Sequence, residues 1–169
     1  MQAKLKKYKA YLFDMDIDKI KPLIHRESIV HSMVEFTDNS IIAQLGNHDM
    51  RLPISYAMFY PKRVKSLAKS LDFKTLSNLS FQEVDLEKYP LLALAIECFK
   101  LGGSKRTVLN AANEAAVSLF LNEKVSFIEI ERIVIEAVKN HIIIPNPSLE
   151  EIYKIDSLVK NQIFAKYTK

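Results

Sequence analysis

Three aspartates near the N-terminus alternate with other residues, and alternating carboxylates are how a calcium-binding loop begins. They are Asp14, Asp16 and Asp18. Calcium prefers several oxygen ligands, and the loop that supplies them also requires glycine at its sixth position and glutamate at its twelfth. Lys19 and His25 occupy those two positions here. The spacing therefore does not support a calcium site.

The same segment has a second interpretation, as the first motif of a phosphatase. The string Tyr11-Leu-Phe-Asp-Met-Asp16 resembles that of haloacid-dehalogenase-type phosphatases. In those enzymes an aspartate nucleophile follows an apolar strand, and a second aspartate acts as acid and base. Glycine and threonine usually come next, whereas Ile17 and Asp18 follow here. We favour a solvated turn and keep the phosphatase as an alternative.

The other residue types that carry chemistry form no catalytic or metal-ligating pattern. The four histidines are His25, His31, His48 and His141, and no two of them have the spacing of a zinc site. Cys98 lies in an apolar helical stretch, where cysteine behaves as a small hydrophobe. A single cysteine also excludes a disulfide framework. We therefore assign no catalytic residue and no metal ligand.

Composition narrows the function classes further. The chain has only three glycines, Gly46, Gly102 and Gly103, so it lacks the glycine-rich loop that cradles the phosphates of a nucleotide. Its net charge of +4 comes from scattered residues without an RNA-binding or zinc-finger motif, which argues against a nucleic-acid partner. No apolar run reaches the about 18 residues of a membrane helix. We expect a cytoplasmic protein with no membrane partner.

The first half of the chain combines short strands with short helices. Asp38-Asn39 predicts a two-residue hairpin connection, because asparagine tolerates the positive φ of a primed turn. Asp49 is a candidate N-cap for the helix that ends before Pro61. The predicted elements are a helix over 1–13, strands over 20–25, 28–37, 40–45 and 79–81, and a helix over 50–60.

The second half is predicted to be helical. Pro90 suits a first helical turn, and Gly102 closes the helix over 91–101. Thr107 is a candidate cap for a helix over 108–122. Capping boxes open the last two helices at Ser126-Phe-Ile-Glu129 and Ser148-Leu-Glu-Glu151. Helices joined by short loops pack as a bundle.

These elements predict an α+β fold. A β-hairpin or small sheet with flanking helices comes first, and a C-terminal helical bundle follows. We place the two domains at residues 1–80 and 81–169, the second of which holds four helices.

Three long strings, in order, resemble the 1-deoxy-D-xylulose 5-phosphate reductoisomerase family. Ile24-His-Arg-Glu-Ser-Ile-Val-His-Ser-Met-Val-Glu-Phe36 is similar to its I-H-P-Q-S-[IV]-[IV]-H-S-M-V. Ala43-Gln-Leu-Gly-Asn-His-Asp-Met-Arg-Leu-Pro-Ile54 is similar to A-Q-L-G-x-P-D-M-R-x-P-I, and Val108-Leu-Asn-Ala-Ala-Asn-Glu114 to L-N-A-A-N-E. The resemblance covers about residues 12 to 160, which is far more specific than one short motif.

The resemblance implies an architecture and an activity. Members of the family are homodimeric enzymes of non-mevalonate isoprenoid biosynthesis, which rearrange and reduce their sugar phosphate with NADPH and Mg²⁺ or Mn²⁺. An NADPH domain comes first, then a catalytic domain and a helical domain. This chain resembles the end of the catalytic domain and the helical domain. The resemblance also implies a homodimer formed through the hairpin region, where an exposed strand edge can pair with the same edge of a second copy.

A few site residues carry over from the family strings. Ser28 matches a serine of the substrate pocket, whose hydroxyl can hydrogen-bond sugar-phosphate oxygens. Met50 matches a methionine beside the nicotinamide, where a thioether packs well. His31 matches a family histidine to which we assign no role. Arg26 and His48 each replace a family proline.

Other family positions are changed or lie outside the resemblance. Leu5 stands where the family has a metal-binding glutamate, and Met1-Gln2 where it has Asn-Lys. Leucine cannot bind a hard cation. We therefore predict a partial reductoisomerase that binds neither NADPH nor metal alone and is inactive alone. A non-catalytic dimerisation or scaffold remnant is the main alternative.

Overall fold

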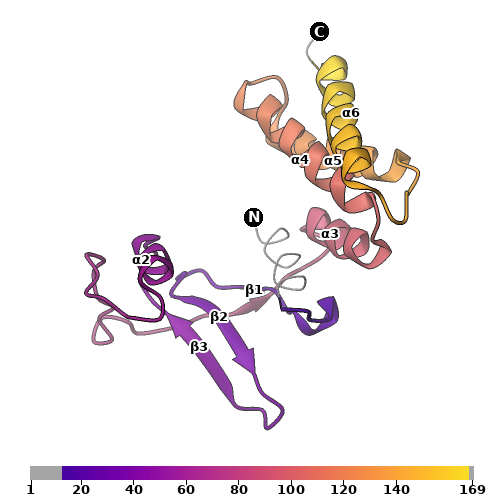
Figure 1. The fold of residues 1–169 in the computed structure, drawn as a ribbon. Coiled ribbons are helices and arrows are strands. Elements are labelled where there is room, and N and C mark those ends of the chain that lie inside the picture. The colour runs from indigo at the N-terminus through magenta and orange to yellow at the C-terminus, as the bar shows by residue number, and fades with distance from the viewer. Residues whose placement is uncertain (1–12, 168–169) are drawn as a thin grey trace. The chain divides into compact units, whose positions relative to one another are not determined.

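The computed structural model describes residues 13–167, and the chain divides into two compact units. The hairpin unit comprises Leu23–Val84. The helical unit comprises the residues before Leu23 and those from Asp85 onward. Small antiparallel sheets and helices together confirm the α+β class (Figure 1). The domain assignment at 1–80 and 81–169 stays a prediction, and the helix expected over 1–13 falls almost wholly outside the described residues.

The hairpin unit is built around the predicted hairpin, with a longer connection than expected. Strand β2 (Val30–Glu35) pairs antiparallel with β3 (Ile41–Leu45), and the register is irregular between Val30 and Ser32. The two-residue connection was wrong: the Phe36 N–H donates to the Ser40 carbonyl at 2.9 Å, which leaves three residues in the loop. Asn39 adopts the positive φ of 64° that such a loop requires.

Two shorter elements complete this unit. Strand β1 (Leu23–Ile24) pairs antiparallel with β4 (Gln82–Glu83), one residue beyond the predicted strand at 79–81. Helix α2 (Arg51–Phe59) has Met50 at its N-cap position, one residue after the predicted cap, although the Asp49 carboxylate accepts the Arg51 N–H at 2.9 Å.

Most of the helical unit follows the capping signals in the sequence. A 3₁₀ turn, η1 (Ile17–Lys19), precedes α3 (Pro90–Leu101), α4 (Lys105–Leu121), α5 (Phe127–Asn140) and α6 (Leu149–Tyr167). Both capping boxes are present. The cap at Thr107 was wrong, because α4 begins at Lys105, three residues before the predicted start, with Ser104 at its N-cap position.

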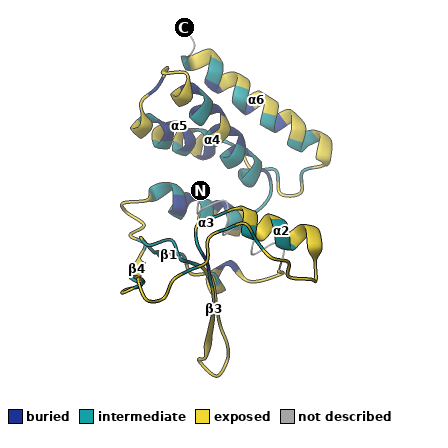
Figure 2. Ribbon diagram, turned by 90° about the vertical axis from the view of Figure 1, so that its left-hand side faces the viewer, coloured by how far each residue is buried: buried dark blue, intermediate teal, exposed yellow. Residues whose placement is uncertain are grey.

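The core of the helical unit forms around α4, which packs against α3, α5 and α6. Its buried face consists largely of alanines, and small side chains let neighbouring helices approach closely. Figure 2 shows the buried residues along α4 and α5. The buried residues of the core are Leu94, Cys98, Val108, Ala111, Ala112, Ala115, Ala116, Leu119, Val125, Ile130, Ile133, Val134, Val138, Ile155, Val159 and Ile163. None of the helices in residues 13–167 is long and apolar enough to cross a membrane.

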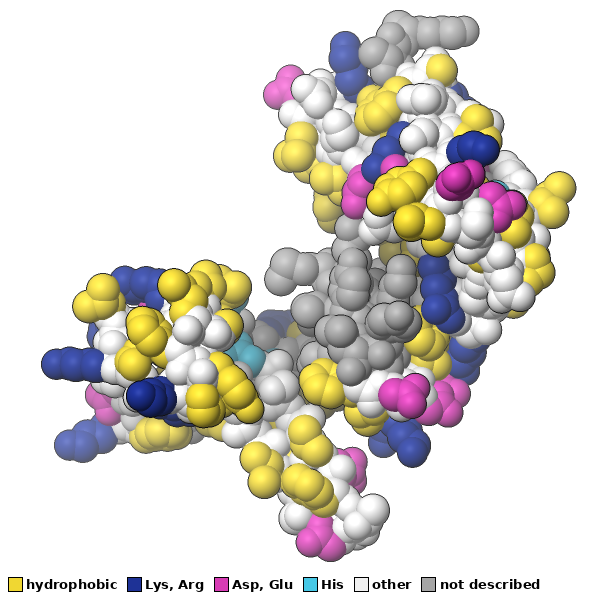
Figure 3. All heavy atoms as spheres, in the orientation of Figure 1, with side chains coloured by type: hydrophobic (Ala, Val, Ile, Leu, Met, Phe, Trp, Pro, Cys, Tyr) yellow, Lys and Arg dark blue, Asp and Glu magenta, His cyan; other side chains and the backbone are white. Residues whose placement is uncertain are grey.

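The hairpin unit contrasts with this core. Every buried apolar side chain of the described residues belongs to the helical unit, and Gly46 is the one buried residue within 23–84. Figure 3 shows hydrophobic side chains gathered over the hairpin and over α2. The exposed large apolar residues of this unit are Met33, Val34, Phe36, Ile41, Ile42, Met50, Ile54, Met58, Phe59, Tyr60, Val64, Leu67, Phe73 and Phe81.

Candidate functional site

The loop between β1 and β2 holds Ser28 in a backbone conformation that serine rarely adopts. Its φ is +53°, in the left-handed region. The next residue, Ile29, donates its N–H to Nε2 of His25 at 3.1 Å. Because Nε2 accepts this bond, the ring proton of His25 sits on Nδ1, which lies 2.8 Å from the Ser80 carbonyl. His25 therefore joins this loop to the segment before β4.

Glu27, the residue before Ser28, is anchored by hydrogen bonds to Ser80. Its carboxylate accepts the Ser80 hydroxyl at 2.7 Å and the Ser80 N–H at 3.2 Å. The hydroxyl bond is the largest cause of a lowered pKa for Glu27, and His25 Nδ1 lies 3.0 Å from the same carboxylate. The Phe81 ring stacks on His25 with 4.8 Å between centroids. Hydrogen bonds thus fix both neighbours of Ser28. A residue held in a rare backbone conformation, as Ser28 is by its positive φ, is typical of functional positions.

Two histidines lie beside Ser28. Nδ1 of His48 is 3.4 Å from the Ser28 hydroxyl oxygen, a long hydrogen bond. The rings of His48 and His31 are 6.4 Å apart. The structure thus brings together two residues singled out in the sequence, Ser28 and His48.

The segment that carries Met50 is anchored on both sides. Asn47 donates its side-chain amide to the carbonyls of Lys69 at 2.7 Å and Ser70 at 3.1 Å. Asp49 binds the Arg51 guanidinium, and this hydrogen bond lowers the pKa of Asp49 to about 2. Met50 itself is 69% exposed. The anchored backbone therefore carries an exposed thioether, and the cofactor role of Met50 stays a prediction.

Asp16 and Asp18 of the N-terminal motif have structural partners. Asp16 accepts the Asp18 N–H at 3.0 Å and so begins η1, and Asp18 forms an ion pair with Lys100 at 2.8 Å. Asp14 lies in a turn with φ of 48°. Within residues 13–167, no three histidine, cysteine, aspartate or glutamate side chains gather closely enough to hold a metal ion. The phosphatase interpretation gains no geometric support here and stays untested.

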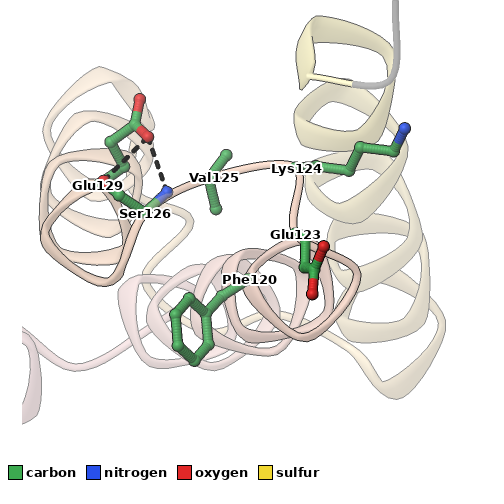
Figure 4. A pocket seen from close by; sticks show the side chains of 6 residues that line it. All are labelled: Phe120, Glu123, Lys124, Val125, Ser126 and Glu129. Atoms are coloured by element: carbon green, nitrogen blue, oxygen red, sulfur yellow. Dashed lines mark hydrogen bonds between the residues drawn. The ribbon is translucent and has the colours of Figure 1, made fainter.

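The hollows of the helical unit offer no catalytic arrangement. One of about 380 Å³ lies at the connection from α4 to α5, lined by six residues (Figure 4). Two of its polar residues form the capping box, since the Glu129 carboxylate accepts the N–H and hydroxyl of Ser126 at 2.8 and 3.0 Å. A groove of about 450 Å³ between α5 and α6 has a mainly apolar floor. The Ser28 loop is therefore the stronger candidate site.

Sequence reasoning missed the partners of this loop. Glu27 and His25 meet Ser80 across 53 and 55 residues of chain, and no local pattern signals such a contact. His48 was noted among the histidines and as a departure from the family string, and its contact with Ser28 was not foreseen.

Known proteins resemble this chain in sequence. The model of the DXP reductoisomerase C-terminal domain matches residues 45–162. The 1-deoxy-D-xylulose 5-phosphate reductoisomerase of an Exiguobacterium species is 51% identical over 90% of this chain and 40% of its own length. That of a Thermoanaerobacter species is 48% identical over 94% of this chain and 42% of its own length. The chain thus spans about two fifths of these relatives.

Solved structures resemble it in fold as well. The Zymomonas mobilis 1-deoxy-D-xylulose 5-phosphate reductoisomerase in complex with NADPH superposes with a TM-score of 0.89 at 39% identity, over 98% of this chain and 44% of that one. A DOX-P reductoisomerase in complex with NADPH, fosmidomycin and magnesium gives a TM-score of 0.91 at 36% identity, over 99% and 43%. By its sequence and its fold, this chain belongs to the 1-deoxy-D-xylulose 5-phosphate reductoisomerase family.

Proposed function

We propose that this chain supplies the C-terminal part of a 1-deoxy-D-xylulose 5-phosphate reductoisomerase and one wall of its substrate site. The observation that carries this is the loop of residues 25–29. It lies within the first family string and holds Ser28 in a strained, preorganised conformation between two anchored neighbours. The Ser28 hydroxyl would hydrogen-bond an oxygen of the sugar phosphate, and Met50 would pack beside the nicotinamide.

The remaining machinery must come from elsewhere. Hydride transfer needs a cofactor that the protein positions against the substrate. The residues present do not fit the metal, because Leu5 replaces the family's glutamate and the described residues hold no cluster of ligands. They also offer no glycine-rich phosphate loop for NADPH. We therefore derive no step through either group and propose that the chain is inactive alone.

The exposed surface of the hairpin unit supports this proposal. A unit with no buried apolar side chain gains little from the hydrophobic effect, which is the dominant favourable contribution to folding. The relatives are more than twice as long as the matched segment. The part of the enzyme that this chain does not span would cover the apolar surface and complete the site.

Complementation tests the proposal. The purified chain is mixed with sugar phosphate, NADPH and Mg²⁺, with and without the part of the Exiguobacterium relative that the chain does not match. We expect NADPH oxidation only in the mixture. We also expect Ser28→Ala to lower kcat/KM on the order of 10-fold, the effect of one lost hydrogen bond to a charged group. Turnover by the chain alone would overturn the proposal.

A homodimer through the hairpin fits the same surface. Val34 and Ile42 lie opposite each other on β2 and β3 and are 57% and 66% exposed. Among residues 13–167, no further strand pairs with the outer edges of this two-stranded sheet. The dimer interface would form part of the complete enzyme. If the chain is instead a scaffold remnant, dimerisation would be its whole function.

Oligomeric state tests the dimer. We expect light scattering to give a mass that rises with concentration toward twice the chain mass. Ile42→Lys should abolish this rise, and the matched control Ile128→Lys, at an exposed position of α5, should not. A concentration-independent monomer would contradict both the dimer and the scaffold role.

A further inference from the structure

Ser28 retains torsional freedom in its side chain although the loop around it is hydrogen-bonded. Its backbone is held by the bonds of His25 to Ile29 and of Glu27 to Ser80. Once the side chain is placed, the hydroxyl can still rotate and exchange its roles of donor and acceptor. The hydrogen-bonding partner of the hydroxyl therefore determines whether Ser28 donates to a ligand or accepts from it.

His48 is that partner in this chain. Its Nδ1 lies 3.4 Å from the Ser28 oxygen. The family string has proline at this position, and a proline side chain carries neither a hydrogen-bonding nor a titratable atom. The contact between Ser28 and His48 is thus a property of this chain that the family string does not contain.

We propose that His48 sets the direction of the Ser28 hydrogen bond and makes the serine's ligand preference depend on pH. With neutral His48 whose Nδ1 is unprotonated, the Ser28 hydroxyl donates to Nδ1 and turns only lone pairs to the ligand. With protonated His48, the ring donates to the Ser28 oxygen. The hydroxyl proton is then free for an anionic oxygen, and a positive charge lies beside it. Only a proton moves, and it comes from solvent.

The acidic side chains near Ser28 are already paired, so we assign the pH dependence to a histidine. From β2, His31 faces His48 across 6.4 Å. At the start of α2, Asp49 and Arg51 neutralise each other. In the loop of Ser28, the Glu27 carboxylate is engaged by Ser80 and His25. Histidine is the side chain that ordinarily changes charge between pH 5 and 8. His31 is therefore the control for any effect assigned to His48.

Nuclear magnetic resonance of the full chain tests the hydrogen bond without turnover. We expect an unprotonated Nδ1 on His48 at pH 8, and we expect the Ser28 resonances to follow the His48 titration down to pH 5. His48→Pro, which restores the family residue, should remove this dependence, and His31→Gln should leave it. Ser28 resonances that follow His31, or that do not change with pH, would overturn the proposal.

The consequence for the ligand rests on the proposed function and is measured in the complemented enzyme. We expect KM for the sugar phosphate to fall on the order of 10-fold from pH 8 to pH 6 relative to His48→Pro, because a hydrogen bond to an anion is gained. kcat should change less than KM. An identical pH profile of KM in the two proteins would refute this consequence. If complementation fails, the resonance experiment still decides the role of His48.

Discussion

At the scale of single residues, the candidate site depends on how Ser28 is held. The sequence identified Ser28 and Met50 through the family strings, and it showed His48 as a substitution. It could not show that Glu27 and His25 meet Ser80, because burial and chain topology create that contact across more than 50 residues. Positive φ at a serine is likewise invisible locally, since serine has no intrinsic preference for it.

Replacing Glu27 by glutamine, the residue of the family string, tests the anchor of this loop. The lowered pKa means that the charged form is favoured in the fold, so its contribution is present above the ordinary value of 4.5 and is lost as pH falls through the lowered value. We expect Glu27→Gln to speed exchange of the Ile29 amide hydrogen several-fold at pH 7. Glu83→Gln, at an exposed position of β4, is the control. Unchanged exchange in Glu27→Gln would contradict the anchor.

At the scale of elements, local signals succeeded where side chains act within one turn of chain. Both capping boxes were predicted because Ser126 and Ser148 each meet a glutamate three residues on. The hairpin loop was wrong by one residue, since Asp38 accepts both the N–H and the hydroxyl of Ser40 and thereby favours the three-residue loop. The start of α4 was missed because the Ser104 side chain bonds to a distant segment and makes no capping hydrogen bond to its own helix.

Ser104 joins α4 to the segment after α5. Its hydroxyl oxygen accepts the Ile144 N–H at 2.8 Å and lies 2.7 Å from His141 Nε2. Ser104→Ala would leave the partly buried Ile144 N–H and His141 ring nitrogen without this partner, and we expect it to lower the free energy of unfolding by about 1–3 kcal/mol. Urea unfolding followed by helical circular dichroism measures this. Ser118→Ala, half-buried on the same helix, should change it by less than about 0.5 kcal/mol. Equal effects would contradict the link.

His141 gives this link a pH dependence of known sign. Burial, and then the charge of Lys105, lower the pKa of His141 from 6.5. The fold therefore favours the neutral ring, and stability is lost as pH falls below 6.5 toward the lowered value. We expect the urea midpoint of the wild type to fall between pH 7.5 and 5. The fall should be smaller in His141→Gln, and an equal fall in both would show that other groups cause it.

At the scale of the whole molecule, the two units rest on different physics. The helical bundle was predictable because its apolar residues recur at helical spacing and can bury each other within the unit. The exposure of the apolar side chains in the hairpin unit could not be predicted. Composition gives the number of apolar residues in a chain and not what they pack against. An isolated two-stranded hairpin is marginally stable at best in water.

This difference predicts unequal protection against hydrogen exchange. In the chain alone, we expect amides of α4 and α5 to exchange slowly and those of β2, β3 and α2 at least about 10-fold faster, because local stability follows buried apolar contact. Adding the complementary part of the relative should slow exchange in the hairpin unit and leave the bundle unchanged. Repeating the experiment over a range of chain concentrations separates that effect from self-association, which would slow β2 and β3 without any partner. Equal, concentration-independent protection of both units in the chain alone would mean that the hairpin unit is stable without any partner to cover its apolar surface.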